Sequence, residues 1–152
     1  MDKHWKLLDL SALALRLALA ASFLSAVADR IGMWGKSGEP RVSWGDFAHF
    51  VVYTERLTSI VPQSLGPSIA WIATIAELVL ALALLVGWQT RIAAILSGSL
   101  LLLFGFAMAF ALGIKAPLDF SVFSAATGAF LLSALDRYQF SLDDRKSKAG
   151  SR

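Results

Sequence analysis

Long apolar runs separated by short polar stretches dominate the chain, and they predict helices that cross a membrane. Four runs approach or exceed the length of about 20 apolar residues that a transmembrane helix needs. Their bounds are about residues 7–28, 68–87, 91–113 and 118–135. Because only a few residues join the second run to the third and the third to the fourth, these helices should be antiparallel neighbours. We therefore expect an all-α polytopic membrane protein, a four-transmembrane-helix bundle in a single domain over residues 1–135.

Several residues mark the expected ends and contacts of these helices. Thr90 is a suitable N-cap for the third helix, and Pro117 is placed to start the fourth. The third helix carries Gly98, and then Gly105, Ala109 and Gly113 at intervals of four residues. Small residues at this spacing let transmembrane helices approach closely, so they predict a packing seam.

The long outer loop, residues 29–67, contains one further helical pattern. In "SWGDFAHFVVYTERLTSIVP", Ser43 and Asp46 have the spacing of a capping box, and apolar residues can share one face of a helix from about Ser43 to Thr58. We expect an amphipathic helix that lies at the outer membrane interface. Trp34 and Trp44 fit the aromatic belt at the same level.

Composition agrees with a membrane protein and excludes several other classes. The chain of 152 residues is 57% hydrophobic and 16% charged, whereas soluble domains are about half apolar and a quarter charged. It has no cysteine, which excludes disulfides, thiolate metal sites and thiol nucleophiles. The net charge of +3 is modest, and the basic residues do not cluster with aromatic residues as they do on a nucleic-acid surface. The expected partner is the lipid bilayer.

The distribution of Lys and Arg predicts the orientation, because these residues accumulate on the cytoplasmic side. Eight of them fall on the side of the two termini and five on the other side. We therefore expect both termini in the cytoplasm and residues 136–152 to form a polar cytoplasmic tail. The last part of this tail, Asp143–Arg152, is expected to carry no fold. An alternative is that Ala26-Val27-Ala28 ends a cleaved signal peptide, although Arg16 interrupts the apolar region.

Two ionisable residues lie inside predicted spans, Arg16 in the first and Glu77 in the second. Both have alanines four residues before and after them, so each lies on a face of small residues that suits close packing against another helix. Counted from the cytoplasmic end of each helix at 1.5 Å per residue, the depths of the two residues in the membrane differ by about 2–6 Å. We therefore expect an intramembrane pair. Their side chains lean in opposite directions, which counts against direct contact. The pair either locks the bundle or lines a polar cavity for a proton, an ion or a headgroup.

Five further residues are predicted to meet at the outer end of the bundle: Asp29, Arg30, Trp34, Lys115 and Asp119. With the interfacial helix above them and Arg16 and Glu77 below, they would surround an outward-facing, mostly apolar pocket with a few polar groups, the usual form of a ligand site. The alternative is that these charges only anchor helix ends.

No self-contained catalytic constellation is evident, so whether the protein is an enzyme stays open. His4 and His49 are the only histidines, and the topology places them on opposite sides of the membrane, which argues against a bis-histidine haem. No metal motif, Ser-His-Asp set or phosphate-binding glycine loop is present.

Three segments resemble the DoxX family of small four-span bacterial membrane proteins: "LRLALAASFLSAVADRIGMWG", "IAELVLALALLVGWQTRIAA" and "FALGIKAPLDFSVFSAA". The resemblance covers about Leu13–Leu135. It implies a bacterial inner membrane protein in a quinone- or redox-linked complex, with quinone as the one cofactor suggested and membrane or redox proteins as partners. Three functions follow: a non-catalytic accessory subunit, a quinone- or lipid-binding subunit of an oxidoreductase, or a small proton or solute transporter that uses Arg16 and Glu77.

Overall fold

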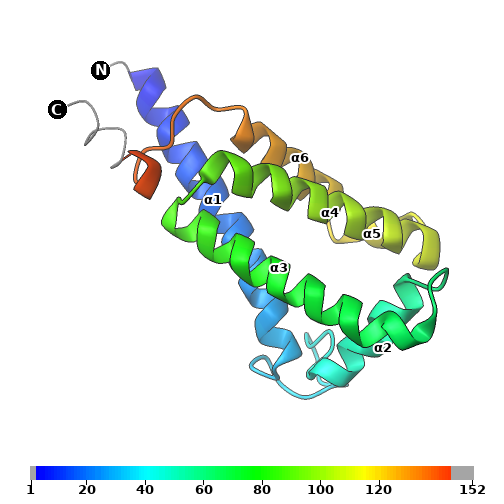
Figure 1. Cartoon of the computed structure of the whole chain (residues 1–152). Coiled ribbons are helices and arrows are strands. Elements are labelled where there is room, and N and C mark those ends of the chain that lie inside the picture. Colours follow the sequence, from blue (N-terminus) through cyan, green and yellow to red (C-terminus); the bar gives the residue numbers. More distant parts are fainter. Residues whose placement is uncertain (1–2, 145–152) are drawn as a thin grey trace.

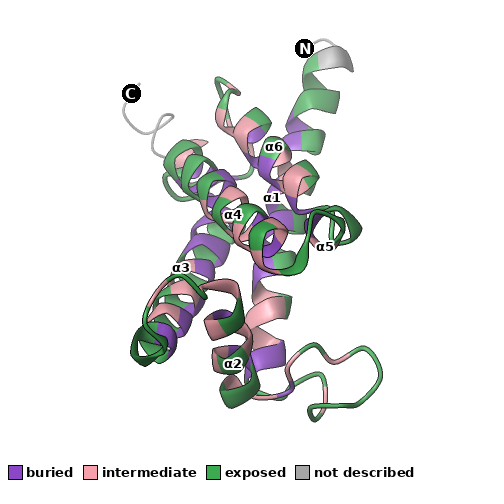
Figure 2. Cartoon of the chain, turned by 90° about the vertical axis from the view of Figure 1, so that its right-hand side faces the viewer, coloured by how far each residue is buried: buried purple, intermediate pink, exposed green. Residues whose placement is uncertain are grey.

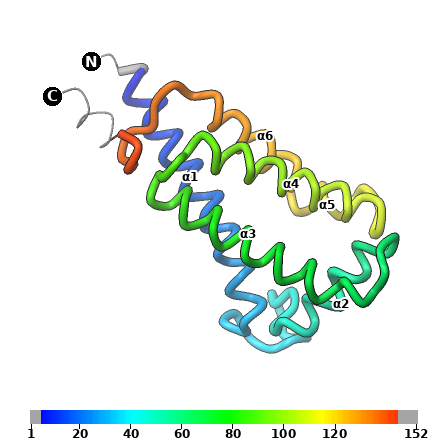
Figure 3. Tube along the Cα trace, viewed as in Figure 1, coloured from blue at the N-terminus to red at the C-terminus, as the bar shows by residue number. Residues whose placement is uncertain are grey.

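The computed structural model describes residues 3–144. In that part of the chain all regular secondary structure is helical, without a strand. Figure 1 shows the helices, and Figure 3 shows the same path as a tube. The α-helices are α1 (Lys3–Arg30), α2 (Phe47–Leu57), α3 (Gly66–Val86), α4 (Thr90–Leu112), α5 (Lys115–Asp119) and α6 (Val122–Ser133), and a 3-10 turn, η1 (Gln63–Leu65), precedes α3.

Three helices confirm the first three predicted spans by length and apolar composition. The candidate spans are Trp5–Arg30, Gln63–Val86 and Thr90–Leu112. Many large apolar side chains on these helices face outward, among them Leu17, Ile72, Ile75, Val79, Leu103 and Phe106, which are 43–68% exposed. Figure 2 shows the buried positions where the helices meet and the exposed ones on the outside. Apolar exposure on this scale suits lipid and not water. The protein is a multi-pass membrane protein.

The predicted fourth span, residues 118–135, is not a continuous helix. Ser121 has φ +54°, in the left-handed region that a right-handed helix excludes, and it separates α5 from α6. Pro117 lies inside α5 and does not start the long helix that we expected. The 12 residues of α6 extend about 18 Å, well short of the roughly 30 Å of a hydrocarbon core.

The core forms where small residues let the helices approach closely. Buried alanines from α1, α3, α4 and α6 surround Leu19, Phe23, Leu84 and Leu132. In α4, Gly98 and Gly105 face the rings of Phe130 and Phe123 in α6, and a Cβ on either glycine would lie 2.8 Å from the ring. This part of the predicted glycine seam is therefore a contact between α4 and α6. At Gly113 no atom would meet a Cβ within 4 Å, so the seam does not extend to that position.

Two predicted helix starts are wrong. The helix in the outer loop begins at Phe47, and its N-cap is Asp46, which accepts the His49 N–H at 2.9 Å; Ser43 does not cap it. At α4 the N-cap is Gln89, and the carboxylate of Asp143 accepts the N–H groups of Gln89 and Thr90 at 3.0 and 2.8 Å. Thr90 itself is fully buried and does not act as the cap. The position of α2 at a membrane interface stays a prediction.

Asp143 also changes the interpretation of the tail. The segment from Tyr138 to Asp144 packs on the turn between α3 and α4, with the Asp143 N–H bonded to the Gly87 carbonyl at 3.2 Å. Ser141 is buried, and its hydroxyl accepts the Asp144 N–H at 3.1 Å. Residues up to Asp144 therefore belong to the fold. Residues 145–152 of the predicted tail lie outside the described part of the chain.

Candidate functional site

Glu77 pairs with Arg30 and not with Arg16. The guanidinium of Arg30, at the end of α1, forms an ion pair with the Glu77 carboxylate in the middle of α3, and both side chains are at most 5% exposed. The same guanidinium donates to the Thr74 hydroxyl at 2.8 Å, and that hydroxyl donates to the Ala70 carbonyl. The α1–α3 pair of helices is thus held by a buried charge pair with a third polar group beside it.

Two aromatic rings complete the surroundings of Arg30. Its guanidinium carbon lies 3.7 Å from the ring centre of Phe50 and 5.2 Å from that of Trp44. Cation–π attraction increases when the cation is removed from water, and Arg30 is only 3% exposed. Because Trp44 precedes α2 and Phe50 lies within it, Arg30 attaches the outer loop to the α1–α3 pair. We call Arg30, Thr74, Glu77, Trp44 and Phe50 the outer cluster.

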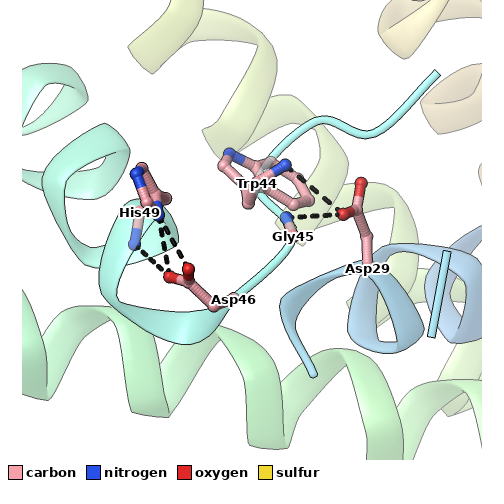
Figure 4. A network of polar contacts seen from close by, with 5 residues as sticks. All are labelled: Asp29, Trp44, Gly45, Asp46 and His49. Carbon is pink, nitrogen blue, oxygen red and sulfur yellow. Dashed lines mark hydrogen bonds and ion pairs between the residues drawn. The ribbon is translucent and has the colours of Figure 1, made fainter. Parts of the chain in front are cut away.

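Asp29, the neighbour of Arg30, fixes the same loop through its backbone. One carboxylate oxygen accepts the Ser43 N–H at 2.8 Å, and the other accepts the N–H groups of Gly45 and Trp44 at 2.9 and 3.3 Å. Figure 4 shows the Asp29 carboxylate beside Trp44 and Gly45. Gly45 has φ +75°, and a Cβ there would overlap the Ser37 backbone, so the turn requires glycine at this position.

Next along the chain, His49 and Asp46 make an exposed pair at the start of α2, also drawn in Figure 4. The His49 ring nitrogen lies 2.9 Å from both Asp46 oxygens. Hydrogen bonds from the backbone and ring of His49 lower the pKa of Asp46 below its ordinary value. This pair caps α2, and its side chains point away from Asp29 in Figure 4.

Arg16 is buried at the opposite end of the α1–α3 pair. It is 1% exposed, and it donates to four backbone carbonyls: Leu84 at 3.0 Å, Leu85 at 3.3 Å, Gln139 at 3.3 Å and Phe140 at 3.4 Å. Two of these belong to the last turn of α3, where unpaired carbonyls and the helix dipole favour a cation. The other two belong to the segment after α6. Arg16 therefore joins three parts of the chain.

In the described part of the chain, the residues of the predicted outer pocket make separate polar contacts. Lys115 and Asp119 pair with each other across one turn of α5, both largely exposed. Trp34 donates from its indole nitrogen to the Ser25 carbonyl at 3.0 Å. Across residues 3–144, no hydrogen bond or ion pair joins Lys115 or Asp119 to Asp29, Arg30 or Trp34. Sequence reasoning missed Arg30 as the partner of Glu77. It also missed the contacts of Arg30 with Thr74, Phe50 and Trp44, and the only signal was the buried acid itself.

A shallow hollow with a volume of about 430 Å³ lies elsewhere, between α3 and α4. Its wall is almost entirely apolar and includes Val79, Leu80, Leu96, Leu100 and Leu103. None of the predicted site residues lines it. In the described part of the chain, no three His, Asp or Glu side chains are grouped as metal ligands.

Comparison with known proteins places this architecture in a family. A family model described as methylamine utilisation protein MauE matches residues 8–121, which is more than half of the chain. The chain belongs to the MauE family. The assignment to DoxX was wrong, because the match is to a different membrane family, and the quinone link that rested on DoxX loses its support. No curated protein and no solved structure matches the chain.

The region shared with the MauE family includes most of the polar groups described above. It contains Arg16, Asp29, Arg30 and Glu77, and it ends at Ser121, directly before α6. The outer cluster of this MauE-family protein lies entirely inside the matched region. Half of the acceptors of Arg16 lie beyond it, after α6.

Proposed function

We propose that this MauE-family protein is an accessory membrane protein of a methylamine-utilisation system and not its amine-oxidising enzyme. The name of the family supports the system. The accessory role rests on one observation: each buried charged side chain binds another part of the same chain. Five charged side chains are buried in the described residues, namely Asp9, Arg16, Asp29, Arg30 and Glu77.

Each of these five charges holds another part of the same chain. Asp9 accepts from Arg137 at 3.0 Å, and the other four bind carbonyls, N–H groups or each other, as described above. Intramembrane charges are costly unless they are paired, and here the pairs join helices to loops. Such a framework suits a protein that positions partner proteins in the membrane. Transport of a proton or solute through Arg16 and Glu77 is a second candidate function. It is favoured only by the position of Glu77 in the middle of α3.

We also propose that α5 and α6 together form the fourth crossing, in broken form, and that both termini face the cytoplasm of a bacterial inner membrane. The contact between Asp9 and Arg137 supports a common end for the start of α1 and the segment after α6. Figure 3 shows these two segments at one end of the bundle and α2 at the other. The excess of Lys and Arg on that side supports the cytoplasmic orientation.

Deleting the gene tests the function. We expect the deletion strain to lose growth with methylamine as the nitrogen source, but not with ammonium, and a plasmid copy to restore it. The Glu77→Gln variant should restore growth if it reaches the membrane at normal levels, because an accessory role needs the fold and not a titrating acid. Unchanged growth of the deletion strain on methylamine would contradict the proposal. A Glu77→Gln protein at normal levels that fails to restore growth would favour the transporter.

A further inference from the structure

The chain reverses direction immediately after α1. The Met33 N–H donates to the Ala28 carbonyl at 3.0 Å, and the Gly32 N–H donates to the Asp29 carbonyl at 3.0 Å. Gly32 has φ +76°, so the turn is a Schellman motif, and the residues that follow it run back along the helix. We call residues 31–34 the hook.

The bond from Trp34 to Ser25 shows how far the hook returns. Ser25 precedes the end of α1 by five residues, which corresponds to about 7 Å along the helix axis. The indole therefore lies beside the final turns of α1 and does not extend beyond them. Its N–H already has an acceptor, so the ring needs no water at this depth.

The hook exposes three large apolar side chains in four residues. Ile31 is 66% exposed, Met33 is 72% exposed and Trp34 is 58% exposed. They continue the exposed apolar surface of α1, a helix that crosses the membrane. The 26-residue candidate span is about 39 Å long, some 9 Å more than the hydrocarbon core, so its last turns reach the boundary between acyl chains and headgroups. At that boundary the available partner with matching chemistry is lipid.

We propose that the hook is a lipid-binding anchor, with Ile31, Met33 and the Trp34 ring in contact with lipid at the boundary between the acyl chains and the headgroups. The polar loop begins directly after it, at Lys36 and Ser37. This placement puts the buried Asp29 and Arg30 at or below the level of the headgroups. It explains why both residues take their polar partners from within the chain, because lipid offers them none. The proposal is independent of the proposed function.

The chain has no cysteine, so single cysteines can report the surroundings of the hook. We would attach a nitroxide to Ile31→Cys and to Met33→Cys, with Ser37→Cys as the matched control, in vesicles of phosphatidylethanolamine and phosphatidylglycerol. Oxygen dissolves in acyl chains and a neutral nickel chelate dissolves in water, so the collision rates separate the two phases. We expect the ratio of oxygen to nickel collisions to be severalfold larger at positions 31 and 33 than at 37.

Two results would overturn the proposal. Nickel collisions at Met33→Cys equal to those at Ser37→Cys would place the hook in water. Low collision rates with both reagents would place it against protein. Tryptophan fluorescence gives an independent check without a new label: brominated lipids should quench the wild-type protein more than the Trp34→Phe variant, and equal quenching of the two would contradict the position of Trp34.

Discussion

At the scale of single residues, Arg30 reaches Glu77 because of the direction in which helical side chains lean. Each Cα–Cβ bond tilts toward the N-terminus of its own helix. Since α1 and α3 are antiparallel, the Arg30 side chain leans back along α1 into the bundle, and Glu77 leans along α3 toward Arg30. Arg16 leans the other way, toward the start of α1, and meets the carbonyls at the end of α3.

These contacts predict which pair of charges is coupled. In a double-mutant cycle, Arg30→Leu and Glu77→Gln should show an interaction of about 1–3 kcal/mol, because either change alone leaves a buried partner unmatched. The matched cycle of Arg16→Leu with Glu77→Gln should be additive to within about 0.5 kcal/mol, because the two residues share no partner. Thermal or steric-trap unfolding in detergent micelles measures both cycles. An additive result for Arg30 and Glu77 would mean that their contact does not contribute to stability.

The sequence was sufficient to identify two of the five buried charges, but not their partners. Arg16 and Glu77 stand out because apolar and small residues surround them. Arg30 lies at the end of an apolar run, where a basic residue usually contacts headgroups. Only the fold of the outer loop, which brings Trp44 and Phe50 over the guanidinium, makes Arg30 an interior residue.

At the scale of helices, α4 and α6 pack by placing aromatic rings against glycines. Phe123 and Phe130 are seven residues apart, as are Gly105 and Gly98, so two ring-to-glycine contacts repeat along one face of each helix. Side chains at those glycine positions would hold the helices apart. The close approach supports α6, which is too short to cross the membrane alone.

Alanine at these glycines should destabilise the contact. Gly98→Ala and Gly105→Ala each place a Cβ 2.8 Å from a ring, and overpacking of this kind costs about 1–3 kcal/mol, partly offset by a helix propensity gain of about 1 kcal/mol. Gly128→Ala is the matched control, because its Cβ would lie at an ordinary 3.4 Å from Leu15. We expect lower unfolding temperatures for the first two variants and an equal or higher one for the control. Equal behaviour of all three would contradict a tight α4–α6 contact.

The helices were predictable where apolar runs are long, as in α1, α3 and α4. The break at Ser121 was not, because "LDFSVFSAA" reads as one continuous helical segment and serine gives no strong signal for a left-handed residue. The capping of α4 by Asp143 was equally out of reach, since the two are more than 50 residues apart in the sequence.

At the scale of the whole molecule, the contact between Asp9 and Arg137 places the start of α1 and the segment after α6 at one end. The outer cluster lies toward the other end, where α2 covers α1 and α3 (Figure 1). The chain therefore returns to the end of the bundle at which it starts.

Cysteine labelling tests this topology. Lys6→Cys and Asp136→Cys should react with a membrane-impermeant maleimide from the same side of the membrane, and Ser37→Cys from the opposite side. All three native residues are exposed, so the substitutions should leave the fold intact. With inside-out and right-side-out vesicles, we expect Lys6 and Asp136 to be labelled from the cytoplasmic side. Labelling of Lys6→Cys and Asp136→Cys from different sides would show that α5 and α6 do not carry the chain back.

The two buried arginines place different demands on sequence variation. The Arg30–Glu77 pair depends on two side chains, so a change at one position alone leaves the other charge without its partner. All four acceptors of Arg16 are backbone oxygens, which every amino acid supplies. Substitutions at positions 84, 85, 139 and 140 therefore leave these bonds in place, although packing in the core still constrains the buried Leu84. Selection falls on Arg16 and on Gly87, where a Cβ would overlap the Arg16 guanidinium, so this junction can persist among relatives that share few of the residues around it.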